Sequence, residues 1–142
     1  MPETYEIDMD QRLVRARAWG VFSNADLRDH YLLLIADVRF EPSFLHLANL
    51  SDVTEFALEP RVIAEIASWP VFDVGTRRAL IAPSDVAYGL SRMFSLHAER
   101  AGQNVQVFRT EQEAVDWLNS PTRPGREPEI TPAAGCVRIR AA

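Results

Sequence analysis

The sequence contains no lysine, and all fifteen of its basic residues are arginine. Codon bias in a GC-rich bacterial genome accounts for this composition, and we draw no functional conclusion from it. The 20 acidic residues outnumber the basic ones and give a net charge of −5. The chain therefore lacks the diffuse positive field that attracts nucleic acid or an anionic membrane surface.

Cysteine and long apolar runs are also scarce. Cys136 is the single cysteine, which excludes an internal disulfide and leaves the redox compartment open. The longest strongly apolar run covers residues 31–36, whereas crossing a bilayer takes about 20 residues. Residues 1–10 are acidic and lack the apolar core of a signal peptide. We therefore expect a cytoplasmic protein without an integral membrane segment.

Motifs for catalysis and cofactor binding are absent as well. The chain has no Gly-x-Ser-x-Gly elbow and no glycine-rich phosphate loop. His30, His46 and His97 lack the four-residue spacing of a helical zinc motif. We predict no metal, no cofactor and no catalysis, and we expect His46 to be a satisfied interior group. An enzyme would need a histidine or carboxylate pair that converges only in space.

The apolar pattern predicts alternating strands and helices. A length of 142 residues with 47% hydrophobic residues suits a single domain with its own core. Period-two and helical spacings predict strands at residues 5–9, 12–19, 44–50, 78–82 and 104–108, and helices at 24–41, 60–69, 85–101 and 111–118. The order β-β-α-β-α-β-α-β-α indicates an α/β fold whose largely parallel sheet has about five strands and one antiparallel edge.

Local signals mark the helix starts and the end of the domain. Ser84 is placed to cap the third helix. Capping boxes are expected at Ser23 with Asp26 and at Thr110 with Glu113. Residues 1–119 form the predicted domain, and residues 120–142 are a proline-rich tail. Residues 136–140 alternate like an edge strand, although an unstructured end is the favoured interpretation.

Three stretches resemble the SpoIIAA-like family of small bacterial proteins, which is related to STAS domains. They are residues 50–56, residues 79–84 with 88–90 and 93–94, and residues 107–110 with 113–114 and 117–118. The resemblance covers roughly residues 5 to 118 and implies a SpoIIAA-like, STAS-like fold. The best understood relatives bind a kinase-like partner and are switched by phosphorylation of a serine after the central strand. Here the corresponding residues 54–60 include two glutamates and no serine, so a phosphate would lie beside like charge.

Two groups of residues are candidate sites. In open parallel sheets, ligands bind outside the carboxyl ends of the strands. The polar residues at those ends form a candidate ligand or phospho-acceptor site: Ser51, Asp52, Thr54, Ser84, Asp85 and Arg109. Helix capping alone also explains Ser84. The apolar residues around the second helix form a candidate partner or apolar-ligand surface: Phe56, Ile66, Trp69 and Phe72.

The leading functional prediction is a non-catalytic regulatory or protein-interaction module. It would bind a protein partner through the second helix and a loop at residues 51–56, and the family resemblance implies a homodimer. The alternative is a carrier or sensor of a small apolar, lipid-like ligand held between the second and third helices and the sheet. A filled space under the second helix would favour the module, and a sizeable apolar cavity would favour the carrier.

Overall fold

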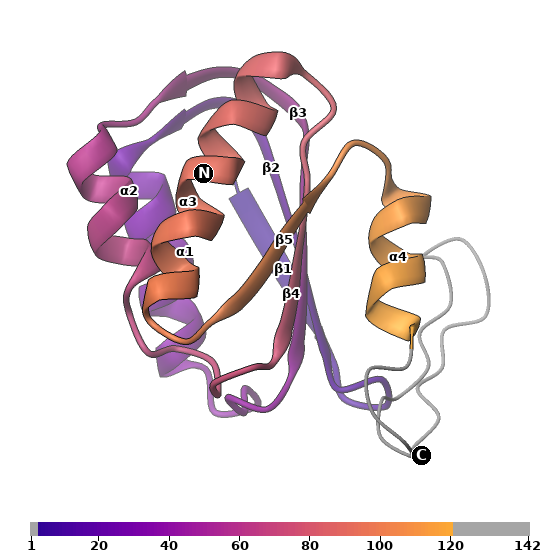
Figure 1. Cartoon of the computed structure of the whole chain (residues 1–142). Coiled ribbons are helices and arrows are strands. Elements are labelled where there is room, and N and C mark those ends of the chain that lie inside the picture. The colour runs from indigo at the N-terminus through magenta and orange to yellow at the C-terminus, as the bar shows by residue number, and fades with distance from the viewer. Residues whose placement is uncertain (1–2, 121–142) are drawn as a thin grey trace.

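The computed structural model describes residues 3–120, and almost all of the predicted tail lies outside them. Residues 3–120 form five strands and four helices, which alternate after an initial strand pair (Figure 1). Their order is β1 (Glu3–Asp8), β2 (Leu13–Ser23), α1 (Asn24–Ala36), β3 (Leu45–Ala57), α2 (Pro60–Ala67), β4 (Arg77–Ile81), α3 (Asp85–Arg100), β5 (Asn104–Phe108) and α4 (Glu111–Asn119). This order confirms the predicted α/β fold class.

The five strands form one sheet in the order β1-β2-β3-β4-β5. β1 pairs antiparallel with β2, and the other neighbouring strands pair in parallel. β2 and β3 stay paired from Leu13 opposite Leu45 to Ser23 opposite Ala57. The pairing of β3 with β4 ends where Asn49 lies opposite Ile81. The carboxyl ends of β2 and β3 therefore project beyond β4 as a two-stranded ribbon.

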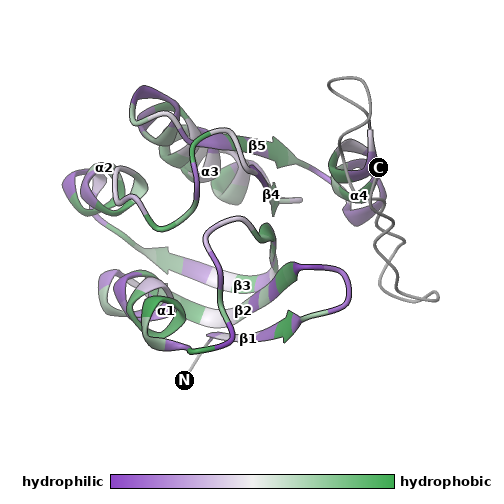
Figure 2. Cartoon of the chain, turned by 90° about the horizontal axis from the view of Figure 1, so that it is seen from below, coloured by the Kyte–Doolittle hydropathy of each residue, from purple (hydrophilic) through white to green (hydrophobic). Residues whose placement is uncertain are grey.

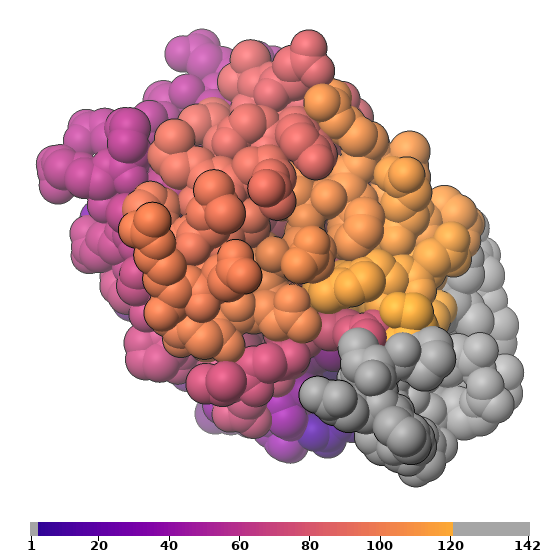
Figure 3. Space-filling view, in the orientation of Figure 1, coloured from indigo at the N-terminus to yellow at the C-terminus, as the bar shows by residue number. Residues whose placement is uncertain are grey.

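Helices cover the two faces of the sheet unequally. α1, α2 and α3 lie on one face, here named the three-helix face, and α4 lies alone on the other, the α4 face (Figure 2). β5 forms one edge of the sheet, with α3 and α4 on either side of it (Figure 3). The larger apolar cluster packs on the three-helix face. The smaller cluster packs under α4 and consists of Leu13, Leu45, Leu47, Ala79, Ile81, Ala114, Val115 and Leu118.

The predicted helix caps are confirmed. The Ser84 side chain accepts a hydrogen bond from the Ala87 backbone N–H at the start of α3. Reciprocal capping boxes begin α1 at Ser23 and α4 at Thr110. Each cap satisfies backbone N–H groups that the first helical turn leaves without partners. These local signals fix where three helices begin, and therefore which strand ends meet them.

Two predicted boundaries are wrong. The loop expected at residues 51–56 is part of β3, because the parallel ladder with β2 continues through these residues. Ser51, Asp52 and Thr54 are therefore strand residues. The first helix ends at Ala36 rather than near Pro42, because Asp37 is extended and its carboxylate accepts a hydrogen bond from the Arg39 backbone N–H at 2.9 Å.

The buried side of α1 is confirmed only in part. The helical spacing of Leu27, Tyr31, Leu34, Ile35 and Val38 predicts one buried face. Tyr31 and Leu34 are buried and Leu27 packs against the core, but Ile35 and Val38 are 54% and 98% exposed. Val38 follows the end of α1, and apolar residues also lie on the exposed side of the helix. The helical period therefore does not fix the limits of the buried side.

None of the helices within residues 3–120 combines the length and the apolar composition needed to cross a membrane.

Candidate functional site

The predicted polar site divides into two parts. Ser84, Asp85 and Arg109 meet where β4 and β5 lead into α3 and α4. Arg109 Nη1 donates to Asp85 Oδ1 at 3.0 Å and to the Pro83 carbonyl at 2.9 Å. The Arg109 guanidinium also lies 4.3 Å from the centre of the Tyr88 ring. The contacts of Arg109 with Asp85 join the starts of α3 and α4, and Ser84 caps α3.

The other three members lie apart on the β2–β3 ribbon. Ser51, Asp52 and Thr54 are exposed on β3. Asp52 Oδ2 accepts from Arg17 Nε at 3.3 Å, across to the neighbouring strand. Within residues 3–120, no hydrogen bond or ion pair connects this group to Ser84, Asp85 or Arg109.

The predicted apolar surface is also divided. Ile66 and Phe72 are each 2% exposed and pack in the core of the three-helix face. Trp69 is half-buried and lines an outer groove between α1 and α2 together with Leu32 and Phe40. Phe56 lies elsewhere, at the end of β3, where it lines a separate cavity.

That cavity lies between the sheet and the three helices. It has about 70 Å³ of room for the centres of water molecules, and one water needs about 10–15 Å³ of such room. The walls are mainly apolar and are contributed by α1, α2, α3 and the middle strands. The apolar lining residues are Ala16, Ala18, Phe22, Leu27, Tyr31, Ala48, Leu50, Phe56, Leu58, Ile63, Leu80, Leu90 and Phe94.

The space exists because the sheet presents small side chains here. Ala16 on β2 lies opposite Ala48 on β3, and Ala48 lies opposite Leu80 on β4. Ala18 continues the same side of β2 and is 4% exposed. Protein cores normally pack with few voids larger than a water molecule. Three alanines beneath three helices therefore leave room that larger side chains would fill.

The cavity meets the surface near the carboxyl ends of the strands. Its larger partly exposed apolar lining residues are Leu27, Leu50, Phe56, Leu58 and Leu90. They come from α1, from the β2–β3 ribbon and the residues after it, and from α3. This is the end of a parallel sheet at which ligands of α/β proteins usually bind.

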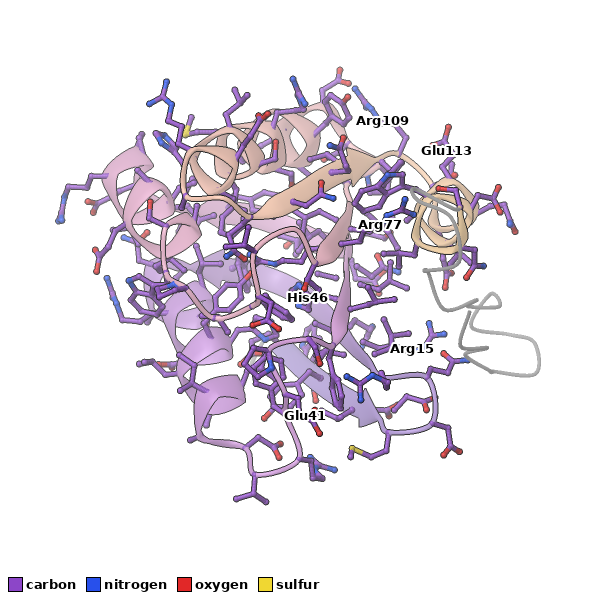
Figure 4. All side chains as sticks on the ribbon, turned by 60° about the horizontal axis from the view of Figure 1, so that its bottom comes forward. Arg15, Glu41, His46, Arg77, Arg109 and Glu113 are labelled. Carbon is purple, nitrogen blue, oxygen red and sulfur yellow. The ribbon has the colours of Figure 1, made fainter. Side chains whose placement is uncertain are left out.

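One side of the cavity carries a buried row of ionisable groups. Glu3 on β1, His30 on α1 and His46 on β3 are 7%, 6% and 1% exposed. His30 Nδ1 lies 3.4 Å from Glu3 Oε1, and His30 Nε2 lies 3.2 Å from His46 Nε2. Figure 4 shows His46 in the interior on the three-helix face, whereas Arg15 and Arg77 lie toward α4.

Both ends of this row keep an unused polar atom. Glu3 Oε1 and His46 Nδ1 are buried and form no hydrogen bond within the described part of the chain. The distance from Glu3 Oε1 to His30 Nδ1 exceeds the usual 2.7–3.2 Å of such a bond. Buried polar atoms are normally hydrogen-bonded. The expectation that His46 is fully satisfied is therefore wrong for its Nδ1 atom.

The surroundings of His46 keep its ring neutral. Burial, the neighbouring His30 and the positive Arg78 together hold the pKa of His46 well below its ordinary value. Arg78 is itself 2% exposed. Its guanidinium donates to the Tyr31 hydroxyl at 2.8 Å and to Gln103 Oε1 at 3.0 Å, and it lies 4.5 Å from the centre of the Phe72 ring.

The row of Glu3, His30 and His46 was not predicted from the sequence. Its members come from a strand, a helix and another strand, so no residue spacing within one element predicts their contact. His46 within an apolar strand was the one available signal. Within residues 3–120, no three His, Cys, Asp or Glu side chains are arranged to hold a metal ion.

No protein-family model and no curated protein matches this sequence. Among solved structures, the chain is similar to an uncharacterised protein of the DUF3478 family with a SpoIIAA-like fold from Shewanella loihica PV-4. The TM-score is 0.55 and the identity 16%, over 82% of this chain and 93% of that chain. The similarity at this identity concerns the fold, and it confirms the predicted SpoIIAA-like architecture.

Proposed function

We propose that this chain binds a small apolar molecule in the cavity of the three-helix face and acts as its carrier or sensor, without catalysing a reaction on it. The observation that supports this function is the cavity itself, which is lined by alanine, leucine and aromatic side chains beside α1, α2 and α3. Apolar pockets with a few polar groups are the usual form of small-molecule sites. The proposal keeps the cytoplasmic location expected from the sequence.

Toluene is a suitable probe, because a single ring matches a cavity with room for several waters. Adding toluene to the full chain is expected to shift the methyl NMR signals of Ala16, Ala18 and Ala48, which line the cavity. The shifts should saturate with toluene concentration, because a single defined site is being filled.

A matched pair of substitutions separates cavity binding from surface adsorption. Ala48→Leu adds three carbons inside the cavity and is expected to abolish saturable toluene binding. Ala25→Leu adds the same carbons at an exposed position of α1 and should leave toluene affinity unchanged. Equal toluene binding by wild type and Ala48→Leu would refute the proposed function.

A second candidate function is self-association through the outer face of α1. Leu32, Leu33, Ile35 and Val38 are 48%, 47%, 54% and 98% exposed, and contiguous apolar patches on soluble proteins mark interaction sites. A second copy of the chain is the proposed occupant, since a two-fold axis can place the four apolar side chains of one copy against those of the other.

Sedimentation velocity tests this self-association. A dimer of the full chain should become monomeric with Ile35→Glu, which places a charge in the patch. Val86→Glu is the control, since Val86 is an exposed apolar residue on another helix. A wild-type monomer, or equal behaviour of both variants, would contradict a dimer through α1.

A further inference from the structure

We propose that the molecule bound in the cavity carries a hydroxyl or amino group, which donates a hydrogen bond to the Glu3 carboxylate. This inference rests on the proposed function and specifies the ligand class. It follows from a cavity that is apolar over most of its wall but is also lined by Glu3 and His46, each of which has a buried polar atom without a hydrogen bond in the described residues.

The hydrogen positions along the row make both unused atoms acceptors. A carboxylate beside His30 Nδ1 favours the tautomer with its hydrogen on that nitrogen. With one hydrogen on each ring, His30 Nε2 then accepts the hydrogen bond from His46 Nε2. His46 Nδ1 therefore carries a lone pair, and Glu3 Oε1 is an acceptor when the carboxyl group is ionised. A ligand that satisfies them must donate.

The charges around the cavity also disfavour an anionic ligand. Glu3 is the carboxylate in the cavity wall. Arg17 lies at the wall too, but its side chain is exposed and paired with Asp52 at 3.3 Å. Arg78 does not line the cavity, and its guanidinium is bound by Tyr31 and Gln103. A ligand carboxylate would therefore lie beside Glu3 in a poorly hydrated space, which is unfavourable.

Four probes of similar size test this ligand class on the full chain: toluene, benzyl alcohol, benzylamine and benzoate. Dissociation constants are measured by NMR titration for wild type, Glu3→Gln and Glu6→Gln. Glu3→Gln should weaken the binding of benzyl alcohol or benzylamine by about tenfold relative to that of toluene, because a hydrogen bond to a charged group is lost. Glu6 is exposed on the same strand, so Glu6→Gln should leave every ratio unchanged.

The outcomes separate the inference from the function on which it rests. Absence of toluene binding to wild type overturns the proposed function itself. If toluene binds but Glu3→Gln changes the affinities of toluene and of the donor probes by the same factor, only the proposed ligand class is overturned. If Glu3→Gln fails to fold, the wild-type protein still decides, because benzoate is expected to bind at least about tenfold more weakly than benzyl alcohol. Equal affinity for the two would overturn the inference.

Discussion

The central strand β3 has two sides that are equally buried but differently composed. Toward α4 it presents Leu45 and Leu47, which pack among leucine, isoleucine, valine and alanine. Toward the three helices it presents His46 and Ala48, one ionisable and one small, both beside the cavity. Burial alone does not explain this difference, because the side chains on both sides of the strand are buried. The side chains on the α4 face pack closely, whereas those on the three-helix face leave a cavity.

The α4 face holds its buried arginine by internal contacts, although Asn119 Oδ1 at the end of α4 also lacks a hydrogen bond within the described residues. Arg77 is 3% exposed, and its Nη1 donates to the Trp117 and Ser120 carbonyls at the end of α4. A positive side chain at the carboxyl end of a helix also interacts favourably with the helix dipole. On the three-helix face, Glu3 Oε1 and His46 Nδ1 remain without a hydrogen bond in the described residues. Unused buried acceptors therefore border the cavity.

The largest expected contrast is between Leu47→Ala and Ala48→Leu, neighbours on opposite sides of β3. Leu47→Ala should lower the free energy of unfolding by about 2–5 kcal/mol, because it opens a void in a packed cluster. Ala48→Leu should raise it by about 0.5–2 kcal/mol, as cavity-filling substitutions do. Urea denaturation measures both. A larger loss for Ala48→Leu than for Leu47→Ala would contradict the contrast between the two faces.

The next expected effect is a pH dependence that originates on the three-helix face. The pKa of His46 is lowered in the folded state, so below pH 6.5 the unfolded chain binds more protons. Stability must therefore fall as the pH falls. Between pH 7.5 and 5.5, one such histidine accounts for a loss of about 1.4 kcal/mol in the free energy of unfolding.

Two histidine variants assign this pH dependence. His46→Gln should remove most of the difference between the two pH values, whatever its effect on stability at pH 7.5. His97→Gln, on the half-buried side of α3, should keep it. A wild-type protein equally stable at both pH values would show that His46 is not held neutral by its surroundings.

The smallest expected effect belongs to the α4 face. Thr110→Ala removes the side-chain cap of α4 and should lower the free energy of unfolding by about 1 kcal/mol. It should leave toluene affinity unchanged, because α4 contributes no residue to the cavity wall. Reduced toluene affinity in this variant would show that the two faces are coupled and would contradict their independence.

The sequence predicts the fold well where the determinants are local. Ser84 and Thr110 identify helix starts through their own side chains, and strand periodicity identifies the middle of the sheet. On α1, Tyr31 and Leu34 are buried as the helical spacing predicts, but Ile35 is exposed, because apolar residues occur around most of the helix.

The candidate site was beyond such prediction. Glu3, His30 and His46 are far apart in the chain, and they meet only because α1 packs on the face of the sheet to which β1 and β3 contribute Glu3 and His46. The alternation of Val14, Ala16 and Ala18 predicts one face of a strand, but alternation does not tell whether a small side chain leaves a space. That depends on what the three helices place above it.

The most direct test is a crystal structure of the full chain soaked in toluene-saturated solution. We expect a toluene ring between the sheet and the three helices, in contact with Ala48, Leu80 and Phe94. Side chains such as Phe94 filling that space, with no toluene there, would contradict a ligand cavity on the three-helix face.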